Sequence, residues 1–345
     1  MYFDTLPNEI LTHVFLSLPS ITSAIALSST CHRFHSAYNS SKKIVILQEA
    51  ADTELGPIND IVQLLTQNAS QPAHIQRDVP MSEALLRQVI KAGRVAQHYE
   101  EIYTFKKWKT DYANRRLLTS QERYNLRRAI YRLWLFDKAF HTFAHVRTCR
   151  GLPEVAMKRH ALLHNWTTSE LAEMLDVHIV LRDLVANNVC PSNGKIRQKF
   201  SKRFPESNQQ LLFNIHLNYP PAPSSFVPDS WYHNSAIGSS RYQSRLAPSR
   251  WHEPGAEGWG DDISHYYVVE DMMKLDPEQI LYLRDNCPLK SQVETHVRGL
   301  GEWFVNNGET FSESVAFVVR QRGGDIEDLK MAIEDGEAGI AIVDD

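Results

Sequence analysis

Residues 4–19 read DTLPNEILTHVFLSLP, and the apolar residues in this stretch recur at helical spacing. Pro7 lies where a helix can begin, because proline lacks the N–H that would have no partner in the first turn. Asp4 or Thr5 is expected to cap that turn. Pro19 interrupts the pattern, since proline cannot continue a helix. The sequence therefore predicts a short amphipathic helix between two prolines.

Two further short helices are expected directly after this one. Ser20 or Thr22 can cap the first of them, and Cys31, Phe34 and Tyr38 lie at the spacing of the second. A module of residues 1–45 buries too little surface to be robust alone. Its apolar stripe is therefore expected to pack on a partner or on the rest of the chain.

The order of residues in this module resembles the F-box, the adaptor-docking module of SCF ubiquitin ligases. The resemblance rests on Leu-Pro-x-Glu-Ile-Leu at residues 6–11, a second Leu-Pro at residues 18–19, and Ser28 followed by Cys-His-Arg-Phe at residues 31–34. Phe34 stands where many members have Trp, and Thr30 where Val is common. Both differences weaken packing without forbidding the fold.

The resemblance implies a function and a set of contacts. The chain would be the substrate-recognition subunit of an SCF E3 ligase, would bind a Skp-family adaptor, and would direct an unknown protein to ubiquitination and proteasomal degradation without catalysing a reaction. Glu9 fits the helix dipole as well as it fits an adaptor contact. The residues implied to face the adaptor are Leu6, Pro7, Ile10, Leu11, Phe15, Leu18, Pro19, Cys31 and Phe34.

Length and composition bound the remainder of the chain. The 345 residues exceed one average domain, and 43% apolar with 23% charged residues are ordinary globular values. We expect a mainly α protein, with a three-helix F-box at residues 1–45 and a larger, irregular helical domain at residues 46–345. After residue 45 the sequence shows no repeat of fixed length of the kind that is typical of a solenoid or a propeller.

Helical patterns dominate residues 81–189. One helix is predicted from Glu83, another over residues 122–149, and a third after a Thr167-x-x-Glu170 capping box. Further helices are expected from Asp276, over residues 292–304 and over residues 312–320. The Arg127, Arg128, Arg132 and Lys138 side chains are expected to line solvent. An arginine- and aromatic-rich helix followed by residues 166–171 is similar to what many fungal F-box proteins carry after the box.

A proline-rich segment at about residues 190–261 interrupts these patterns and is predicted to be irregular. Its bulky aromatic residues favour packing on a surface over full disorder. Irregular segments on rigid scaffolds often carry recognition. We therefore predict that Trp231, Trp251 and Trp259 contribute to a substrate-binding surface.

The net charge is −4, but the charged residues are unevenly distributed along the chain. Residues 87–150 contain fifteen Lys and Arg against five acids, whereas the tail at residues 325–345 contains eight acids and one lysine. The basic region leaves open a second function, binding of nucleic acid or another acidic partner by an F-box-like protein outside any ligase. No recognisable nucleic-acid-binding motif contains these basic residues. We therefore favour a solvated helix face, neutralised in part by the acidic tail.

No cofactor, metal or membrane partner is predicted. The four cysteines are widely scattered, and no long apolar run appears, which suits a cytoplasmic or nuclear protein. Asp137, His141, His145 and Cys149 follow one another at spacings of four, but a helix turns such positions about 40° per step, so all four cannot meet one ion. We expect structural histidines there and no catalysis by this chain.

Overall fold

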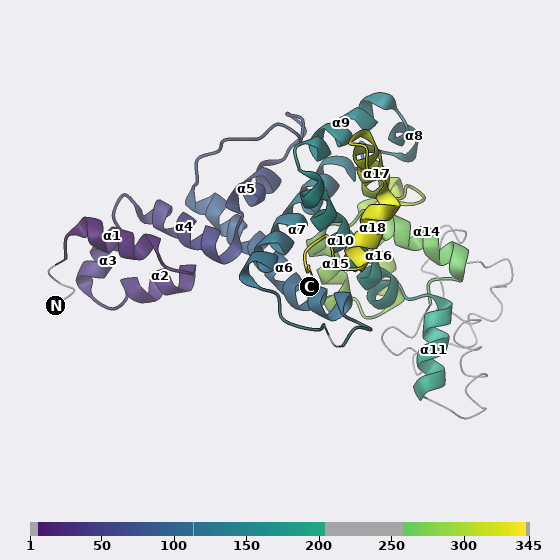
Figure 1. Cartoon of the computed structure of the whole chain (residues 1–345), viewed down its shortest axis with the longest axis horizontal. Helices are drawn as coiled ribbons and strands as arrows, with labels where there is room; N and C mark the ends of the chain where they lie inside the picture. Colours follow the sequence, from purple (N-terminus) through teal and green to yellow (C-terminus); the bar gives the residue numbers. More distant parts are fainter. Residues whose placement is uncertain (1–5, 113, 204–257, 343–345) are drawn as a thin grey trace. The chain divides into compact units, whose positions relative to one another are not determined.

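The computed structural model describes residues 6–112, 114–203 and 258–342 (Figure 1), without side chains for residues 199–203. Every regular element within those ranges is a helix, and none is a strand. The prediction of a mainly α protein with small N-terminal helices and a larger helical region is therefore confirmed. Residues 204–257 of the predicted proline-rich segment lie outside the described residues, and the prediction of irregular structure is wrong for Asn193–Arg203, which is helical.

The chain divides into two compact units. The first comprises Met1–Leu135, Asn165–Val177 and Leu329–Asp345, and the second comprises Phe136–His164 and His178–Asp328. Residues 6–45 thus belong to the same unit as the helices that follow them. The domain boundary predicted near residue 45 stays a prediction.

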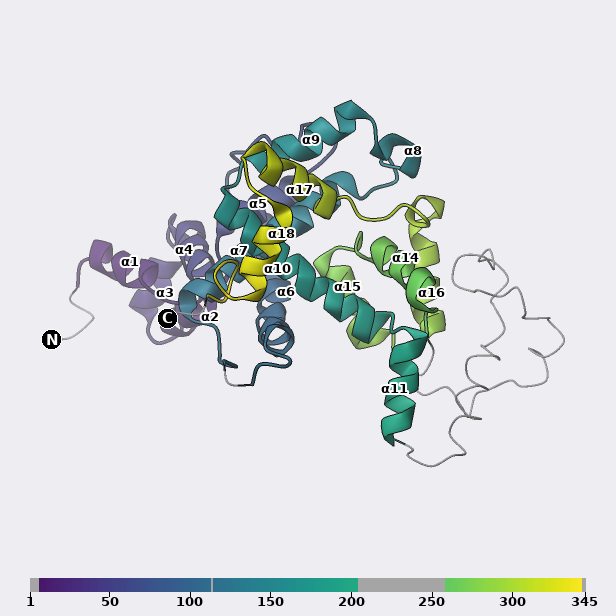
Figure 2. The ribbon, with the colours of Figure 1, turned by 45° about the vertical axis from the view of Figure 1, so that its right-hand side comes forward.

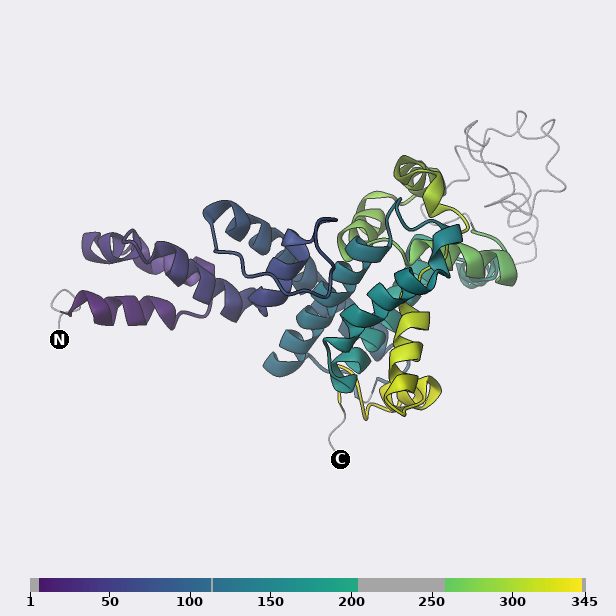
Figure 3. The same cartoon turned by 90° about the horizontal axis from the view of Figure 1, so that it is seen from above.

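The first unit begins with α1 (Asn8–Leu16), α2 (Ile21–Ser28) and α3 (His32–Tyr38), which pack with one another (Figure 3). Next come α4 (Lys43–Leu55), α5 (Ile58–Thr66), α6 (Glu83–Lys107) and the first part of α7 (Ser120–Phe140). α4 packs on both α1 and α2, and also on α6. Gly93 permits the close approach of α6 to α4, because a Cβ there would lie 2.7 Å from Leu55 Cδ1. The long α4 thereby joins the N-terminal module to the rest of its unit.

The second unit is built around α9 and α17, which pack along each other (Figure 2). The π-helical segment η2 packs with α14 and α15. Besides the end of α7, the elements that lie at least partly in this unit are α8 (Arg147–Arg150), α9 (Pro153–His164), α10 (Thr168–Leu184), η2 (Val185–Val189), α11 (Asn193–Arg203), α14 (Asp262–Met272), α15 (Pro277–Asn286), α16 (Lys290–Leu300), η3 (Glu302–Phe304), α17 (Phe311–Gln321) and α18 (Ile326–Glu334).

Several predicted helix starts are confirmed by their caps. Ser20 Oγ accepts the Ser23 N–H at 3.0 Å at the start of α2. The Thr167–Glu170 capping box forms before α10, with Glu170 N–H donating to Thr167 Oγ1 at 3.2 Å. The predicted start at Asp276 carries a second capping box, with Gln279 N–H donating to Asp276 Oδ1 at 2.8 Å. These contacts are local, which is why sequence alone predicts them.

The single helix predicted over residues 122–149 is wrong. α7 ends at Phe140, and the four-residue α8 follows after a turn. In that turn Thr142 Oγ1 accepts the Ala144 N–H at 3.4 Å, which gives the backbone an alternative to helical bonding. Phe143 lies in this turn and is 80% exposed.

The prediction that the arginines of α7 line solvent is wrong for Arg127 and Arg132, which are buried. Arg127 donates to Glu100 at 3.1 Å, and Arg132 donates to Asp60 at 3.2 Å. Lys138 is exposed, as predicted. Guanidinium groups enter the interior because neighbouring helices supply carboxylates, which offset the cost of removing a charge from water.

The basic region is neutralised differently from the prediction. Arg128 forms a close pair with Glu173 at 2.6 Å, so the acids that balance α7 come from α5, α6 and α10. In the described part of the acidic tail, a backbone carbonyl accepts a hydrogen bond from a basic side chain: Lys107 donates to Ile333 O at 2.7 Å. Arg127, Arg128 and Arg132 of α7 are thus paired with carboxylates within the first unit.

Candidate functional site

The N-terminal module has its own small core. Leu11 and Phe15 project from one face of α1, four residues apart, and both are fully buried. The Phe15 ring lies 6.2 Å from the Phe34 ring in an edge-to-face contact and 5.8 Å from the Tyr38 ring. The Phe15 side chain therefore packs α1 against α3, and the adaptor contacts of Leu11 and Phe15 stay a prediction.

Other predicted contact residues remain at the surface of the module. Pro7 and Pro19 are exposed, and Ile10 is 45% exposed although it neighbours Leu11, because adjacent helix positions lie about 100° apart. Leu6, Leu18, Cys31 and Phe34 are partly exposed. The predicted stripe is therefore divided between an internal core and a set of apolar side chains that a partner can reach.

Two features of the module were not predicted from the sequence. Arg33 of α3 donates a hydrogen bond to the Leu6 carbonyl and so ties α3 to the start of α1. Glu54 of α4 accepts the Ile21 N–H at 2.9 Å at the start of α2. Both contacts join residues far apart in the chain, and no local pattern marks them. Ile25 of α2 is a further apolar side chain at the surface.

A scan against protein-family models matches the same part of the chain. Residues 3–42 match the F-box-like family. The matched range contains α1, α2 and α3 of the F-box-like module. F-box domains are in general protein-interaction modules without catalytic activity, and the sequence resemblance is supported at this level. Searches of curated proteins and of solved structures gave no match.

The predicted substrate-binding tryptophans are placed only in part. Trp231 and Trp251 lie outside the described residues. Trp259 is 1% exposed; its backbone N–H donates to Pro191 O at 2.9 Å, and the Lys290 ammonium lies 5.1 Å from its ring. Trp259 therefore serves as a core residue in this structure, and its role in substrate binding stays a prediction.

Asp137 of α7 and His141, which directly follows this helix, form a structural contact. His141 Nδ1 lies 2.9 Å from Asp137 Oδ1, and His141 Nε2 accepts the Thr310 N–H at 3.2 Å. This network assigns the ring proton to Nδ1. Burial raises the pKa of Asp137 well above its ordinary range and lowers the pKa of His141 well below it. The described residues contain no cluster suited to a metal ion.

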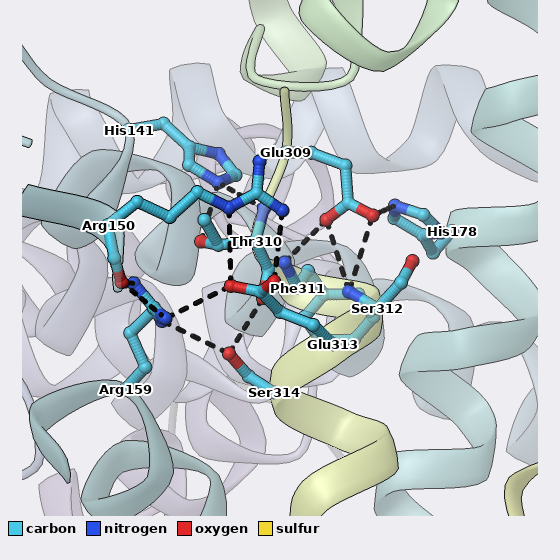
Figure 4. Close-up of polar contacts among 10 residues, drawn as sticks. All are labelled: His141, Arg150, Arg159, His178, Glu309, Thr310, Phe311, Ser312, Glu313 and Ser314. Atoms are coloured by element: carbon cyan, nitrogen blue, oxygen red, sulfur yellow. Dashed lines mark hydrogen bonds and ion pairs between the residues drawn. The ribbon is translucent and has the colours of Figure 1, made fainter. Parts of the chain in front are cut away.

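The start of α17 carries a polar network that the sequence did not indicate (Figure 4). The Glu309 carboxylate accepts the backbone N–H groups of Phe311 and, at 3.1 Å, of Ser312, which satisfies donors of the first helical turn. Glu309 also lies 4.0 Å from His178 Nε2, and burial lowers the pKa of this histidine. The network fixes the start of α17.

Arg159 completes this network from α9. Its guanidinium donates to Ser314 Oγ at 3.2 Å and to Glu313 at 3.0 Å, and both terminal nitrogens donate to the Arg150 carbonyl at 3.2 Å (Figure 4). Burial lowers the pKa of Arg159. These contacts bind α8, α9 and α17 together.

None of the helices in the described ranges is long and apolar enough to cross a membrane.

A buried lysine in the second unit gives a pH-dependent prediction. Lys274 is almost fully buried; it donates to Asp271 at 3.0 Å and to the Phe304 carbonyl. Burial lowers the pKa of Lys274 from 10.5 to about 8. Between these two pH values the unfolded chain binds more protons than the folded chain, so stability rises with pH.

We expect Lys274→Met to remove this gain of stability at alkaline pH. The shift corresponds to roughly 3 kcal/mol in the free energy of unfolding between pH 8 and 10.5. Urea unfolding of the wild type and of Lys274→Met at several pH values in this range checks it. The wild type should gain stability relative to the variant as the pH rises, and two parallel pH profiles would contradict the prediction.

Proposed function

We propose that this protein is the substrate-recognition subunit of an SCF ubiquitin ligase and acts in the cytoplasm or nucleus. The F-box-like module would bind a Skp-family adaptor, and residues after about 48 would recruit a protein substrate. The observation that carries the proposal is the match of residues 3–42 to the F-box-like family. The exposed part of the predicted stripe supports it.

The exposed apolar residues supply a physical reason for docking. Leu11 and Phe15 complete the internal core, whereas Pro7, Ile10 and Pro19 leave apolar surface in contact with water. Full burial of an isoleucine side chain contributes about 1.5–3 kcal/mol, so several such residues can offset the cost of association. An adaptor groove of complementary shape would remove this apolar surface from water.

The proposed mechanism is proximity. The chain would hold its substrate near a ubiquitin-charged enzyme and raise the effective concentration of the reacting groups. The F-box-like module would need no catalytic residue for this task. The substrate lysine and the ubiquitin thioester would carry the chemistry.

We expect Ile10→Asp to weaken adaptor binding by at least about tenfold, because an unpaired carboxylate would be removed from water at the interface. The fold should survive, since Ile10 is 45% exposed in the free chain. Co-purification of the full-length chain with its Skp-family adaptor, followed by titration calorimetry, measures the effect. Circular dichroism verifies that the variant is folded.

His13→Asp is the matched control, because His13 is also exposed on α1 but is not among the predicted contacts. It should bind the adaptor as the wild type does. Equal binding by Ile10→Asp and the wild type would contradict the predicted interface. An absence of wild-type binding would reject the ligase proposal and favour an interaction role outside a ligase.

A further inference from the structure

A cavity of about 830 Å³ in the second unit has no part in the proposed adaptor docking. It is bordered by α8, the start of α9, α14 and the segment that leads into α17. Its volume falls within the range of small-molecule sites. Gly308 permits the close approach of Arg150 in its wall, because a Cβ at that position would lie 2.9 Å from a terminal nitrogen of Arg150.

Every acidic side chain that lines this cavity already has a basic partner. Glu313 accepts from Arg150 at 3.0 Å and from Arg159 at 3.0 Å (Figure 4). Glu270 pairs with Arg182 at 2.5 Å. These carboxylates are therefore compensated from within the protein.

Asp271, the third acid of the lining, is saturated in the same way. Its carboxylate accepts the Asn306 N–H at 2.8 Å and the Asn307 N–H at 2.9 Å, in addition to the Lys274 ammonium. Asn306 has a positive φ of 54°, a conformation that asparagine tolerates, and this turn aims both N–H groups at Asp271. The acids thus have little capacity left to attract a cation into the cavity.

Several hydrogen-bond donors that line the cavity, in contrast to the acids, have no hydrogen-bond partner in the part of the chain that the structure describes. Within the described residues, the Arg147 guanidinium forms no ion pair or hydrogen bond, and it is exposed. The hydroxyls of Tyr266 and Tyr267 and the side-chain amide of Asn306 also lack a hydrogen-bond partner there. Four side chains that can donate hydrogen bonds therefore border one cavity, together with one uncompensated positive charge.

We propose that this cavity binds a ligand that carries an oxyanion, either a phosphate or a carboxylate group. Arg147 provides the charge, because a guanidinium offers a planar pair of donors to such a group. The tyrosine hydroxyls and Asn306 add neutral donors. Arg150 and Arg159 stay with Glu313 and fix the wall on which the ligand rests.

The test uses the full-length protein, with inorganic phosphate and citrate as probes. Titration calorimetry at constant ionic strength, balanced with sodium chloride, should show saturable binding of at least one probe. The identity of the bound probe separates a phosphate ligand from a carboxylate ligand. Arg147→Ala should weaken that binding at least about tenfold.

Arg320→Ala is the matched control, because Arg320 is exposed on α17 but does not line the cavity. It should bind the probe as the wild type does, and Arg147→Lys should retain part of the affinity. Arg147 is a surface side chain, so its replacement leaves the fold intact. A lack of saturable binding, unchanged binding by Arg147→Ala, or equal loss in Arg320→Ala would each overturn the proposal.

Discussion

Replacement of Asp176 by alanine is expected to lower the free energy of unfolding of the first unit by about 3–5 kcal/mol. The Asp176 carboxylate is 1% exposed. It accepts hydrogen bonds from Tyr103 Oη at 2.6 Å, from Lys107 Nζ at 3.0 Å and from the Ile340 N–H at 3.0 Å. Its removal would leave the Tyr103 hydroxyl and the Ile340 N–H without this acceptor, and the Lys107 ammonium, which still donates to Ile333 O, without its carboxylate partner.

The same carboxylate attaches the C-terminal segment to α6 and α10. Gly339, with φ of 94°, permits this contact, since a Cβ there would lie 2.6 Å from an Asp176 oxygen. Tyr103 is held in its neutral form, because burial and the neighbouring Asp176 raise its pKa. Loss of Asp176 should therefore release residues 339–342 before the rest of the unit unfolds.

Chemical unfolding, combined with hydrogen exchange at Ile340, measures both effects. Asp176→Asn retains an acceptor oxygen and should lose less stability than Asp176→Ala. Asp78→Ala serves as the control, since Asp78 is an exposed acid of the same unit. A change below about 1 kcal/mol for Asp176→Ala would show that the network is dispensable.

Replacement of Phe15 by alanine is expected to cost about 3–5 kcal/mol and to unfold the F-box-like module selectively. Phe15 is fully buried against Phe34 and Tyr38. The module has few other large buried side chains to compensate, because so small a core has little reserve. Hydrogen exchange over residues 8–38 and circular dichroism measure the loss.

Ile10→Ala is the matched control for this experiment, because it removes an apolar side chain from the same helix at a surface position. It should change stability by less than about 1 kcal/mol. The pair separates the core function of α1 from its proposed docking function. Similar destabilisation by both variants would contradict the division of the stripe into an internal and an exposed part.

The sequence predicted where many helices begin because the signals are local. Ser20 caps α2, the Thr167 box precedes α10, and Asp276 precedes α15. Each signal involves residues within one turn of the chain, so side-chain chemistry and spacing suffice to recognise it. The F-box resemblance is equally local, since it depends on the order of residues in three consecutive short helices.

Tertiary contacts decided which side of each helix is buried. Ile10 and Leu11 are adjacent apolar residues, yet only Leu11 enters the core, because α3 and α4 cover that face of α1. Similarly, Arg127 is buried because the Gly56 carbonyl and Glu100 receive its guanidinium. No pattern within α7 distinguishes this arginine from a solvated one.

The cavity beside Arg147 depends entirely on such distant contacts. Its lining joins residues 147–159, 266–271 and 306–313, which are neighbours only after folding. Local chemistry therefore set the helix starts and the F-box-like pattern. The division between core, docking surface and cavity arose from packing between distant segments, because burial depends on what covers a side chain and not on its neighbours in the sequence.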